Sequence, residues 1–180
     1  MKKLALTDFA KYRYPSALEL SPDSRYLTFA LKDVDREGDG YRWNLWLYDL
    51  ERRESRQITQ GDDQRKAVWE DNTHILYKTT EPDEALRARG FEEEWTVYHR
   101  LNVCTGEDRE AFRLPMSVSG LWKMDEGRYV FTGETHLDRP NLLELTGEAL
   151  EKELVRRQQT RGYKVLTELP LCENGVGMFN

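Results

Sequence analysis

The chain has 180 residues, of which 38% are hydrophobic and 11% aromatic, a composition that predicts a folded core and argues against disorder. Its 33 acidic and 27 basic residues are well interspersed and give a net charge of −6, so no basic stripe is available for a nucleic-acid backbone and nucleic-acid binding is not expected. No segment approaches the roughly 20 apolar residues that a membrane-spanning helix needs, so we expect no membrane insertion.

The chain begins like a signal sequence, but Asp8 and Lys11 interrupt it before any useful apolar stretch. Export is therefore not predicted, and we expect a cytoplasmic location. The two cysteines, Cys104 and Cys172, are far apart and have no second Cys or His at ligand spacing. We expect reduced thiols, no metal site, no redox pair and no cofactor.

Residues 1–16 are predicted to form an N-terminal arm, either an entry strand or a docking arm, because several aromatic residues stand there among charges and must pack on something. These residues are Phe9, Tyr12 and Tyr14. After the arm, Leu18 and Leu20 flank Glu19, an alternation typical of a half-buried strand. We expect this strand to be the innermost one of a sheet.

One pattern occurs three times along the chain: an Asp-led turn directly before a strand that ends in an aromatic residue. The copies are residues 21–29, 69–77 and 122–131, and aligning Asp23, Asp71 and Asp125 also aligns Phe29, Tyr77 and Phe131. Successive aspartates are 48 and 54 residues apart, a period that indicates four-stranded propeller blades. Aspartate bonds readily to nearby backbone amides, so all three are predicted to be turn formers.

The same order of elements follows each copy. Strand-like segments occur at 44–50, 95–103 and 141–145, and the first two are followed by polar turns at 51–54 and 104–107. The sequence therefore predicts a mainly β fold, an incomplete β-propeller of about two to three four-stranded antiparallel blades. We assign blade 1 to residues 17–62, blade 2 to 63–115 and a partial blade 3 to 116–180.

Two helices are expected between the strands. Residues 82–90 favour two helical turns, with Pro82 at the start and Gly90 at the end. A helical insert is predicted at 146–162, with a surface helix near 147–161 that Thr146 caps. Its apolar stripe, Leu150 and Leu154, is narrow.

The insert also holds two pairs of opposite charge in favourable order, Glu148 with Lys152 and Glu153 with Arg157. Gly162 is the expected end of the helix. Strand-like alternation returns at 163–170, and 174–177 has turn composition, as expected for the start of a link to the next blade.

Catalytic residues are not predicted in this chain. No Gly-x-Ser-x-Gly motif is present, and Ser117 and Ser119 are expected to be turn residues. His74 and His99 fall in predicted strands and His136 in a loop, with no two at ligand spacing, so packing or surface roles are expected. The acidic run 92–94 is interpreted as a solvated loop.

The five tryptophans could stack on a ligand, but most recur at matching repeat positions, which favours packing between sheets. They are Trp43, Trp46, Trp69, Trp95 and Trp122. Trp43 and Trp46 are three residues apart in a strand and so point to opposite faces.

Residues 21–29, followed by 44–50 and 56–59, resemble the blades at the N-terminus of the prolyl oligopeptidase and acylaminoacyl-peptidase (S9-type) family of serine peptidases. Residues 137–142, 168–171 and 174–180 look like the same family's link into the next blade. In that family a propeller, usually of seven blades, covers an α/β-hydrolase domain with a Ser, Asp and His triad and restricts entry to short peptides.

The resemblance implies that this chain supplies about two blades and the start of a third, with everything catalytic beyond Asn180. The expected partners are the remaining blades and the hydrolase domain, with peptides as substrate of the parent protein and no enzyme activity in the chain alone. Two alternatives are a WD-like or TolB-like interaction scaffold and a self-assembling propeller that forms an oligomer.

Overall fold

A computed structural model describes residue 8 and residues 11–35, 40–135 and 139–160, with the backbone alone described at 126, 171–173 and 177–179. The chain divides into two compact units, Met1–Leu137 and Asp138–Asn180.

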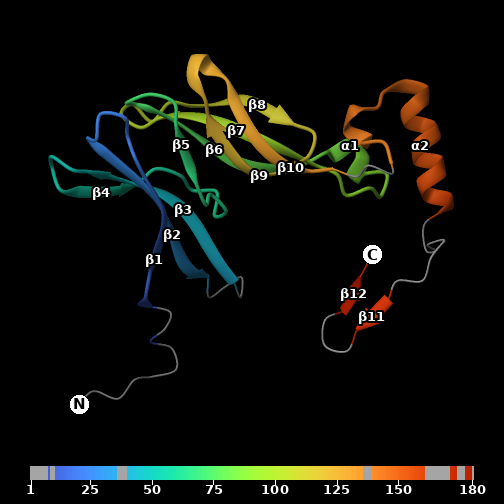
Figure 1. The fold of residues 1–180 in the computed structure, drawn as a ribbon, viewed down its shortest axis with the longest axis horizontal. Coiled ribbons are helices and arrows are strands. Elements are labelled where there is room, and N and C mark those ends of the chain that lie inside the picture. The colour runs from blue at the N-terminus through green and yellow to red at the C-terminus, as the bar shows by residue number, and fades with distance from the viewer. Residues whose placement is uncertain are drawn as a thin grey trace. The chain divides into compact units, whose positions relative to one another are not determined.

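The first unit begins with a four-stranded antiparallel sheet whose strands are neighbours in sequence order (Figure 1). The strands are β1 (Tyr14–Leu20), β2 (Tyr26–Asp35), β3 (Gly40–Asp49) and β4 (Glu54–Gln57). Between β1 and β2, the Asp23 carboxylate accepts hydrogen bonds from the Ser21 hydroxyl at 2.6 Å and the Arg25 amide at 3.2 Å. The predicted role of Asp23 as a turn former is confirmed.

Strand β1 begins within the segment predicted to be the N-terminal arm. Strand pairing begins at Tyr14, inside the segment 1–16 that the sequence assigns to an arm. Tyr12 and Tyr14 are both exposed, so no described residue covers them. For Tyr14 this agrees with the place of β1 at the edge of its sheet.

A second four-stranded antiparallel sheet repeats the first. Its strands are β5 (Ala67–Trp69), β6 (His74–Pro82), β7 (Glu94–Asn102) and β8 (Asp108–Leu114). In the turn between β5 and β6, the Asp71 carboxylate accepts hydrogen bonds from the amides of Thr73 at 2.7 Å and His74 at 2.8 Å. Asp71 therefore forms its turn through its side chain, as predicted.

A third, two-stranded sheet follows. Strands β9 (Ser117–Lys123) and β10 (Tyr129–Glu134) are joined through a single 3₁₀ turn, η2 (Asp125–Gly127). Here the backbone carbonyl of Asp125 accepts a hydrogen bond from the Arg128 amide at 3.4 Å, and Gly127 has a φ of 72°, which glycine adopts without strain.

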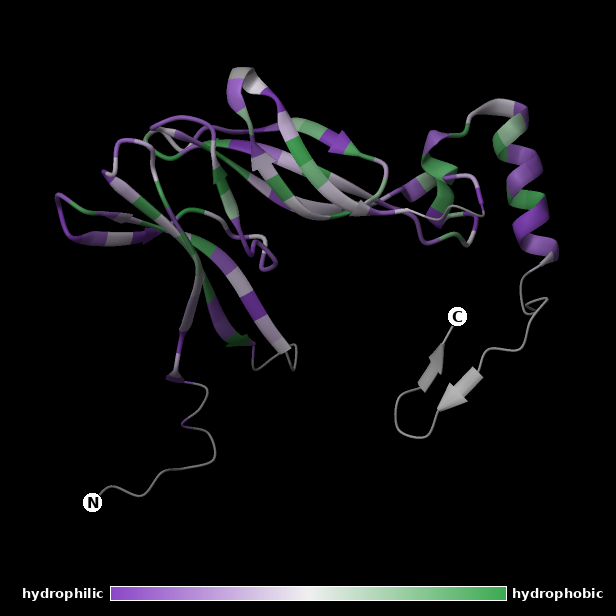
Figure 2. Cartoon of the chain, viewed as in Figure 1, coloured by the Kyte–Doolittle hydropathy of each residue, from purple (hydrophilic) through white to green (hydrophobic). Residues whose placement is uncertain are grey.

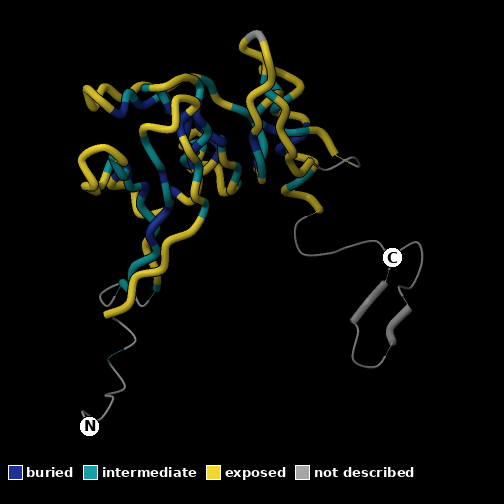
Figure 3. Tube along the Cα trace, turned by 60° about the vertical axis from the view of Figure 1, so that its left-hand side comes forward, coloured by how far each residue is buried: buried dark blue, intermediate teal, exposed yellow. Residues whose placement is uncertain are grey.

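The three sheets pack face to face through two apolar clusters. The cluster between the first and second sheets consists of Ala30, Leu45, Leu47, Ala67, Trp69, Ile75, Tyr77, Leu101 and Val103. The cluster between the second and third consists of Leu76, Tyr98, Val118 and Leu121. In Figure 3 buried segments lie along the middles of the strands, whereas the connecting hairpins are exposed. This face-to-face order is that of successive propeller blades.

The helix expected at 82–90 is shorter than predicted. Helix α1 (Glu84–Arg87) has one turn, because Pro82 is still the last residue of β6 and Asp83 serves as the N-cap, accepting a hydrogen bond from the Leu86 amide at 3.0 Å. Gly90 has a φ of 82° and follows the helix, as predicted.

The second unit contains a 3₁₀ turn, η3 (Leu142–Glu144), and helix α2 (Gly147–Gln159). Leu142 and Leu154 are its buried apolar side chains, so α2 is a surface helix with a narrow apolar stripe, as predicted. Thr146 stands at the N-cap position but makes no side-chain capping bond there, so that part of the prediction is wrong. Its backbone carbonyl instead accepts a hydrogen bond from the Leu150 amide.

Both predicted charge pairs of α2 form. Lys152 Nζ lies 2.7 Å from the Glu148 carboxylate. Glu153 is buried, and its carboxylate lies 2.7 Å from Arg156 and 3.0 Å from Arg157. The hydrogen bond from Arg156 has the largest effect on Glu153, and together with that from Arg157 it lowers the pKa to about 2. Among the residues that the structure describes, no helix combines the length and apolar character needed to cross a membrane.

The C-terminal part of this unit holds an antiparallel pair, β11 (Leu171–Glu173) and β12 (Gly177–Phe179). The pair flanks the segment predicted to be a turn. Gly162 and the strand expected at 163–170 lie outside the described residues, as does His136.

Candidate functional site

The serines that were predicted to form a turn lie in a strand instead. Ser117 begins β9, and Ser119 stands where the pairing of β9 with β10 becomes irregular, its hydroxyl 2.9 Å from that of Thr132. The turn prediction is wrong because Val118 and Leu121 pack against the second sheet and bring this segment into the fold as a strand. An extended strand is not the strained turn on which hydrolases hold a nucleophilic serine.

His99 belongs to a polar cluster on the second sheet. Its Nε2 lies 3.0 Å from the Thr79 hydroxyl, its Nδ1 lies 3.8 Å from the Asp108 carboxylate, and its ring stacks on Tyr77 with centroids 5.1 Å apart. Burial raises the pKa of Tyr77, and the hydrogen bond that the Tyr77 hydroxyl donates to Asp108 raises it further. A separation of 3.8 Å exceeds hydrogen-bond length, so Asp108 does not orient the imidazole as a catalytic acid would.

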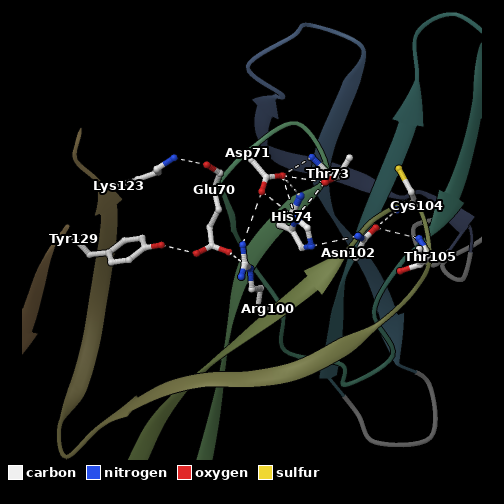
Figure 4. A network of polar contacts seen from close by, with 10 residues as sticks. All are labelled: Glu70, Asp71, Thr73, His74, Arg100, Asn102, Cys104, Thr105, Lys123 and Tyr129. Carbon is white, nitrogen blue, oxygen red and sulfur yellow. Dashed lines mark hydrogen bonds and ion pairs between the residues drawn. The ribbon is translucent and has the colours of Figure 1, made fainter. Parts of the chain in front are cut away.

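A larger polar network surrounds the turn between β5 and β6, and we define it as the turn network (Figure 4). In its first half, Asp71 lies 2.9 Å from His74 Nδ1, and His74 Nε2 lies 3.2 Å from the amide nitrogen of Asn102. The Asn102 side-chain oxygen accepts hydrogen bonds from the backbone amides of Cys104 and Thr105. This half joins two turns at the same end of the second sheet, the one between β5 and β6 and the one between β7 and β8.

The Asp71 carboxylate is held in its charged form. Partial burial by itself would raise its pKa, but hydrogen bonds from Thr73 and His74 outweigh burial and lower the pKa to about 2. The carboxylate therefore stays negative over the physiological range of pH.

The second half of the turn network links two sheets. Arg100 Nε on β7 lies 2.6 Å from the Glu70 carboxylate, which also accepts a hydrogen bond from the Tyr129 hydroxyl on β10 at 2.5 Å (Figure 4). Lys123 on β9 donates to the Glu70 backbone carbonyl. Burial and the bond to Glu70 raise the pKa of Tyr129 to about 12. Hydrogen bonds from Tyr129 and Lys123 tie the third sheet to Glu70. Glu70 Oε2 and Arg100 Nε are both buried and form an ion pair without a hydrogen bond of regular geometry.

Sequence reasoning did not single out Glu70, Arg100 or Tyr129. Each comes from a different strand or turn, and no local spacing marks them as partners. The available signal was the repeat itself, because Glu70 directly precedes the turn-forming Asp71 in the second copy.

The outer face of the first sheet, turned away from the first apolar cluster, carries apolar side chains. Phe29 on β2 and Trp46 on β3 are paired in register and stacked with ring centroids 6.5 Å apart. Leu18 and Leu20 on β1 are 59% and 55% exposed. The expectation of a half-buried strand is wrong for these two leucines, because among the described residues no element packs over them. We call this surface, Leu18, Leu20, Phe29 and Trp46, the open face; Figure 2 shows hydrophobic stretches along these strands.

Charged residues border the open face. A cavity of about 510 Å³ is lined by Arg13, Asp33 and Arg42, among others. Arg13 lies 3.1 Å from the Asp33 carboxylate, and its guanidinium lies 5.9 Å from the centre of the Trp46 ring. An apolar centre with a charged border is the usual composition of a protein interface.

The third sheet also presents apolar side chains to solvent. Trp122 on β9 and Val130 on β10 are paired in register, and Trp122 is 48% exposed. The expected core role therefore holds for Trp69, which is buried, and is wrong for Trp122, whose face of the sheet is uncovered by the described residues. Trp43, Trp46 and Trp95 are half-buried. Trp43 contacts Lys32 and Arg65 while Trp46 contacts Phe29, so the two point to opposite faces, as predicted.

Comparison with models of known protein families gives no match, and no curated protein matches the sequence. Among solved structures, the chain is similar to an acylaminoacyl peptidase from Pyrococcus horikoshii, with a TM-score of 0.52 and 15% identity over 69% of this chain and 18% of that one. It is also similar to the β-propeller domain of the Trilobed protease from Pyrococcus furiosus, with a TM-score of 0.49 and 13% identity over 68% of this chain and 34% of that one.

These likenesses concern the fold. Together with the stacked four-stranded antiparallel sheets, the likeness to the acylaminoacyl peptidase confirms the predicted fold class: mainly β, an incomplete propeller. The chain spans less than a fifth of the length of the acylaminoacyl peptidase that it matches.

Proposed function

We propose that this chain is the non-catalytic N-terminal propeller segment of a cytoplasmic serine peptidase of the prolyl oligopeptidase type. Its partners are the remaining blades and an α/β-hydrolase domain of the same parent protein. Its role is to restrict the access of peptides to that hydrolase domain.

The observation that carries the proposal is the uncovered apolar surface at each end of the stack. The open face, with Leu18 and Phe29, and the outer side of the third sheet, with Trp122 and Val130, are surfaces that a propeller covers with its neighbouring blades. The fold-level likeness to an acylaminoacyl peptidase supports a peptidase as the parent.

A fluorophosphonate probe, which labels activated serines, tests the catalytic part of the proposal. The 180-residue chain is expected to remain unlabelled and not to cleave short chromogenic peptides. The protein encoded when the gene is read past codon 180 is expected to be labelled. Labelling of the short chain, or a downstream sequence without a hydrolase domain, contradicts the proposal.

The gating role needs a separate test in the parent protein. Replacing Leu18 and Leu20 by Glu is expected to weaken contact with the adjoining blade and to increase cleavage of a denatured protein substrate, with little change for a dipeptide substrate. Leu50→Glu, an exposed leucine in the turn after β3, is the matched control. The proposed gating is contradicted if the open-face variant cleaves the denatured protein substrate no faster than the Leu50→Glu control does.

A further inference from the structure

A cavity of about 250 Å³ lies along the groove between the second and third sheets. Its apolar lining comes from Val68, Leu76, Tyr98 and Leu121, which belong to or pack on the second apolar cluster. Its polar lining includes three cationic side chains, described below. We call this cavity the basic groove.

The backbone of β9 forms one wall of the basic groove at Gly120. A Cβ placed on Gly120 would lie 2.4 Å from the Trp122 ring, so the indole lies directly over this glycine. Tyr98, which is buried in the second sheet, adds an aromatic side chain to the lining. Leu76 and Leu121 form the apolar floor of the groove, and this floor can contact an apolar group of a ligand.

Two of the cations, Arg65 and Lys66, stand in the loop before β5, and this loop is fixed to β3. The Trp43 amide donates to the Asp62 carbonyl, and the Gln64 amide donates to the Trp43 carbonyl, both at 2.9 Å. The Arg65 guanidinium lies 4.2 Å from the centre of the Trp43 ring, which holds it in place. The loop thus presents its cations from a fixed base.

The third cation, Lys78, comes from β6, and its Nζ donates to the Val118 carbonyl at 2.6 Å. An ammonium group has three donors, so further donors are available after this bond. Lys66 Nζ lies 3.7 Å from the Glu19 carboxylate, a loose surface pair. Asp63, which lies 2.8 Å from Arg65, is the acidic residue of the lining.

The charge of the basic groove is therefore opposite to that of the chain, which carries a net charge of −6. Three cations beside two carboxylates, Asp63 and Glu19, leave a net positive charge above an apolar floor, which favours a ligand with an anionic head and an apolar body. At about 250 Å³ the cavity is smaller than the roughly 300–1,000 Å³ typical of sites for drug-sized ligands, so it suits one terminal residue and not a nucleotide.

We propose that the basic groove binds the C-terminal carboxylate of a peptide, with the apolar side chain of the last residue on the floor formed by Leu76 and Leu121. The choice of a peptide rests on the proposed function. Arg65, Lys66 and Lys78 bind the carboxylate, so the groove selects peptides with a free C-terminus.

The test is a titration of the ¹⁵N-labelled 180-residue chain, followed by NMR, with N-acetyl-leucine and separately with N-acetyl-leucinamide. The acid is expected to shift the amide signals of Gly120 and Leu121 saturably, and the amide, which lacks the negative charge, is not. Lys66→Gln and Arg65→Gln are each expected to weaken binding of the acid about fivefold or more, because each removes a charge-assisted contact. Both side chains are largely exposed, and the spectrum itself reports whether the variants are folded.

Arg87→Gln on α1, which removes the same charge from an exposed position outside the groove, is the control and is expected to bind like the wild type. Equal binding of acid and amide, equal weakening by the control, or no saturable shift overturns the proposal. Because the measurement needs no hydrolase domain, binding of the acid by a chain whose parent proves not to be a peptidase would refute the proposed function alone.

Discussion

The Tyr129 hydroxyl on β10 donates a 2.5 Å hydrogen bond to the Glu70 carboxylate at the end of β5, and this bond joins the second sheet to the third. Glu70 also forms an ion pair with Arg100, and both charged side chains are partly buried. A neutral hydroxyl thus helps to hold an anion between two sheets.

Tyr129→Phe is expected to lower the free energy of unfolding by about 1–2 kcal/mol, because it leaves one carboxylate oxygen of Glu70 without this donor. Urea denaturation followed by tryptophan fluorescence measures the change. Tyr12→Phe, at an exposed position, is the control and should fall within about 0.5 kcal/mol of the wild type. Equal effects of the two substitutions would show that the Glu70 bond contributes nothing.

Asp71 makes the stability depend on pH. Its pKa is about 2 in the folded chain against about 3.9 for an unfolded aspartate, so its contribution is present above about pH 4 and is lost as the pH falls toward 2. Asp71→Asn should therefore be less stable than the wild type at pH 7 by about 1 kcal/mol, a value reduced because the side chain is 48% exposed.

Urea denaturation of both proteins at several pH values tests this expectation, and the difference between them should shrink as the pH falls below 4. Glu51→Gln, which removes one negative charge from an exposed position in the turn after β3, is the control. A difference between Asp71→Asn and the wild type that is constant with pH would argue against the assigned pKa.

Replacing Trp69 and Trp122 by the same residue should lower the free energy of unfolding by different amounts. Trp69→Phe removes buried volume and the hydrogen bond that the indole donates to the Glu19 carbonyl at 3.2 Å, and should cost about 2–3 kcal/mol. Trp122→Phe, at an exposed position, should cost less than about 1 kcal/mol. The denaturation midpoints of the two variants are compared with that of the wild type. A larger loss of stability for Trp122→Phe than for Trp69→Phe would contradict the assignment of Trp69 to the core.

The open face should control self-association of the chain. Leu18→Glu combined with Leu20→Glu should reduce the mean mass seen by light scattering without lowering the denaturation midpoint, because both side chains already face solvent. Leu50→Glu serves as the comparison, since it adds a similar charge in a turn. If that control reduces association equally, general charge and not the open face is responsible.

Local sequence signals predicted part of the local structure, whereas the turn expected at Ser117 and Ser119 and the cap expected at Thr146 were wrong. The turns at Asp23 and Asp71 and the charge pairs of α2 depend on residues within a few positions of one another. The exposure of Leu18 and Trp122 could not be predicted in this way, because alternation says which residues share a face of a sheet but not whether another sheet covers that face.

The turn network and the basic groove were beyond sequence reasoning for a related reason. Glu70 and Tyr129 are 59 positions apart, and Lys78 and Val118 are 40 apart, so each contact exists only once two sheets are stacked. A repeat predicts that the sheets stack, but not the polar side chains that meet between them.

The second and third sheets are fastened at two separate places. One is the turn network at Glu70, and the other is Thr96, whose hydroxyl donates to the Met116 carbonyl at 2.7 Å and accepts from the Val118 amide at 3.2 Å. Hydrogen bonds at one place alone would allow the two sheets to rotate relative to each other, whereas hydrogen bonds at two separate places oppose both rotation and sliding. Separating these two sheets would therefore require the hydrogen bonds at both places to break.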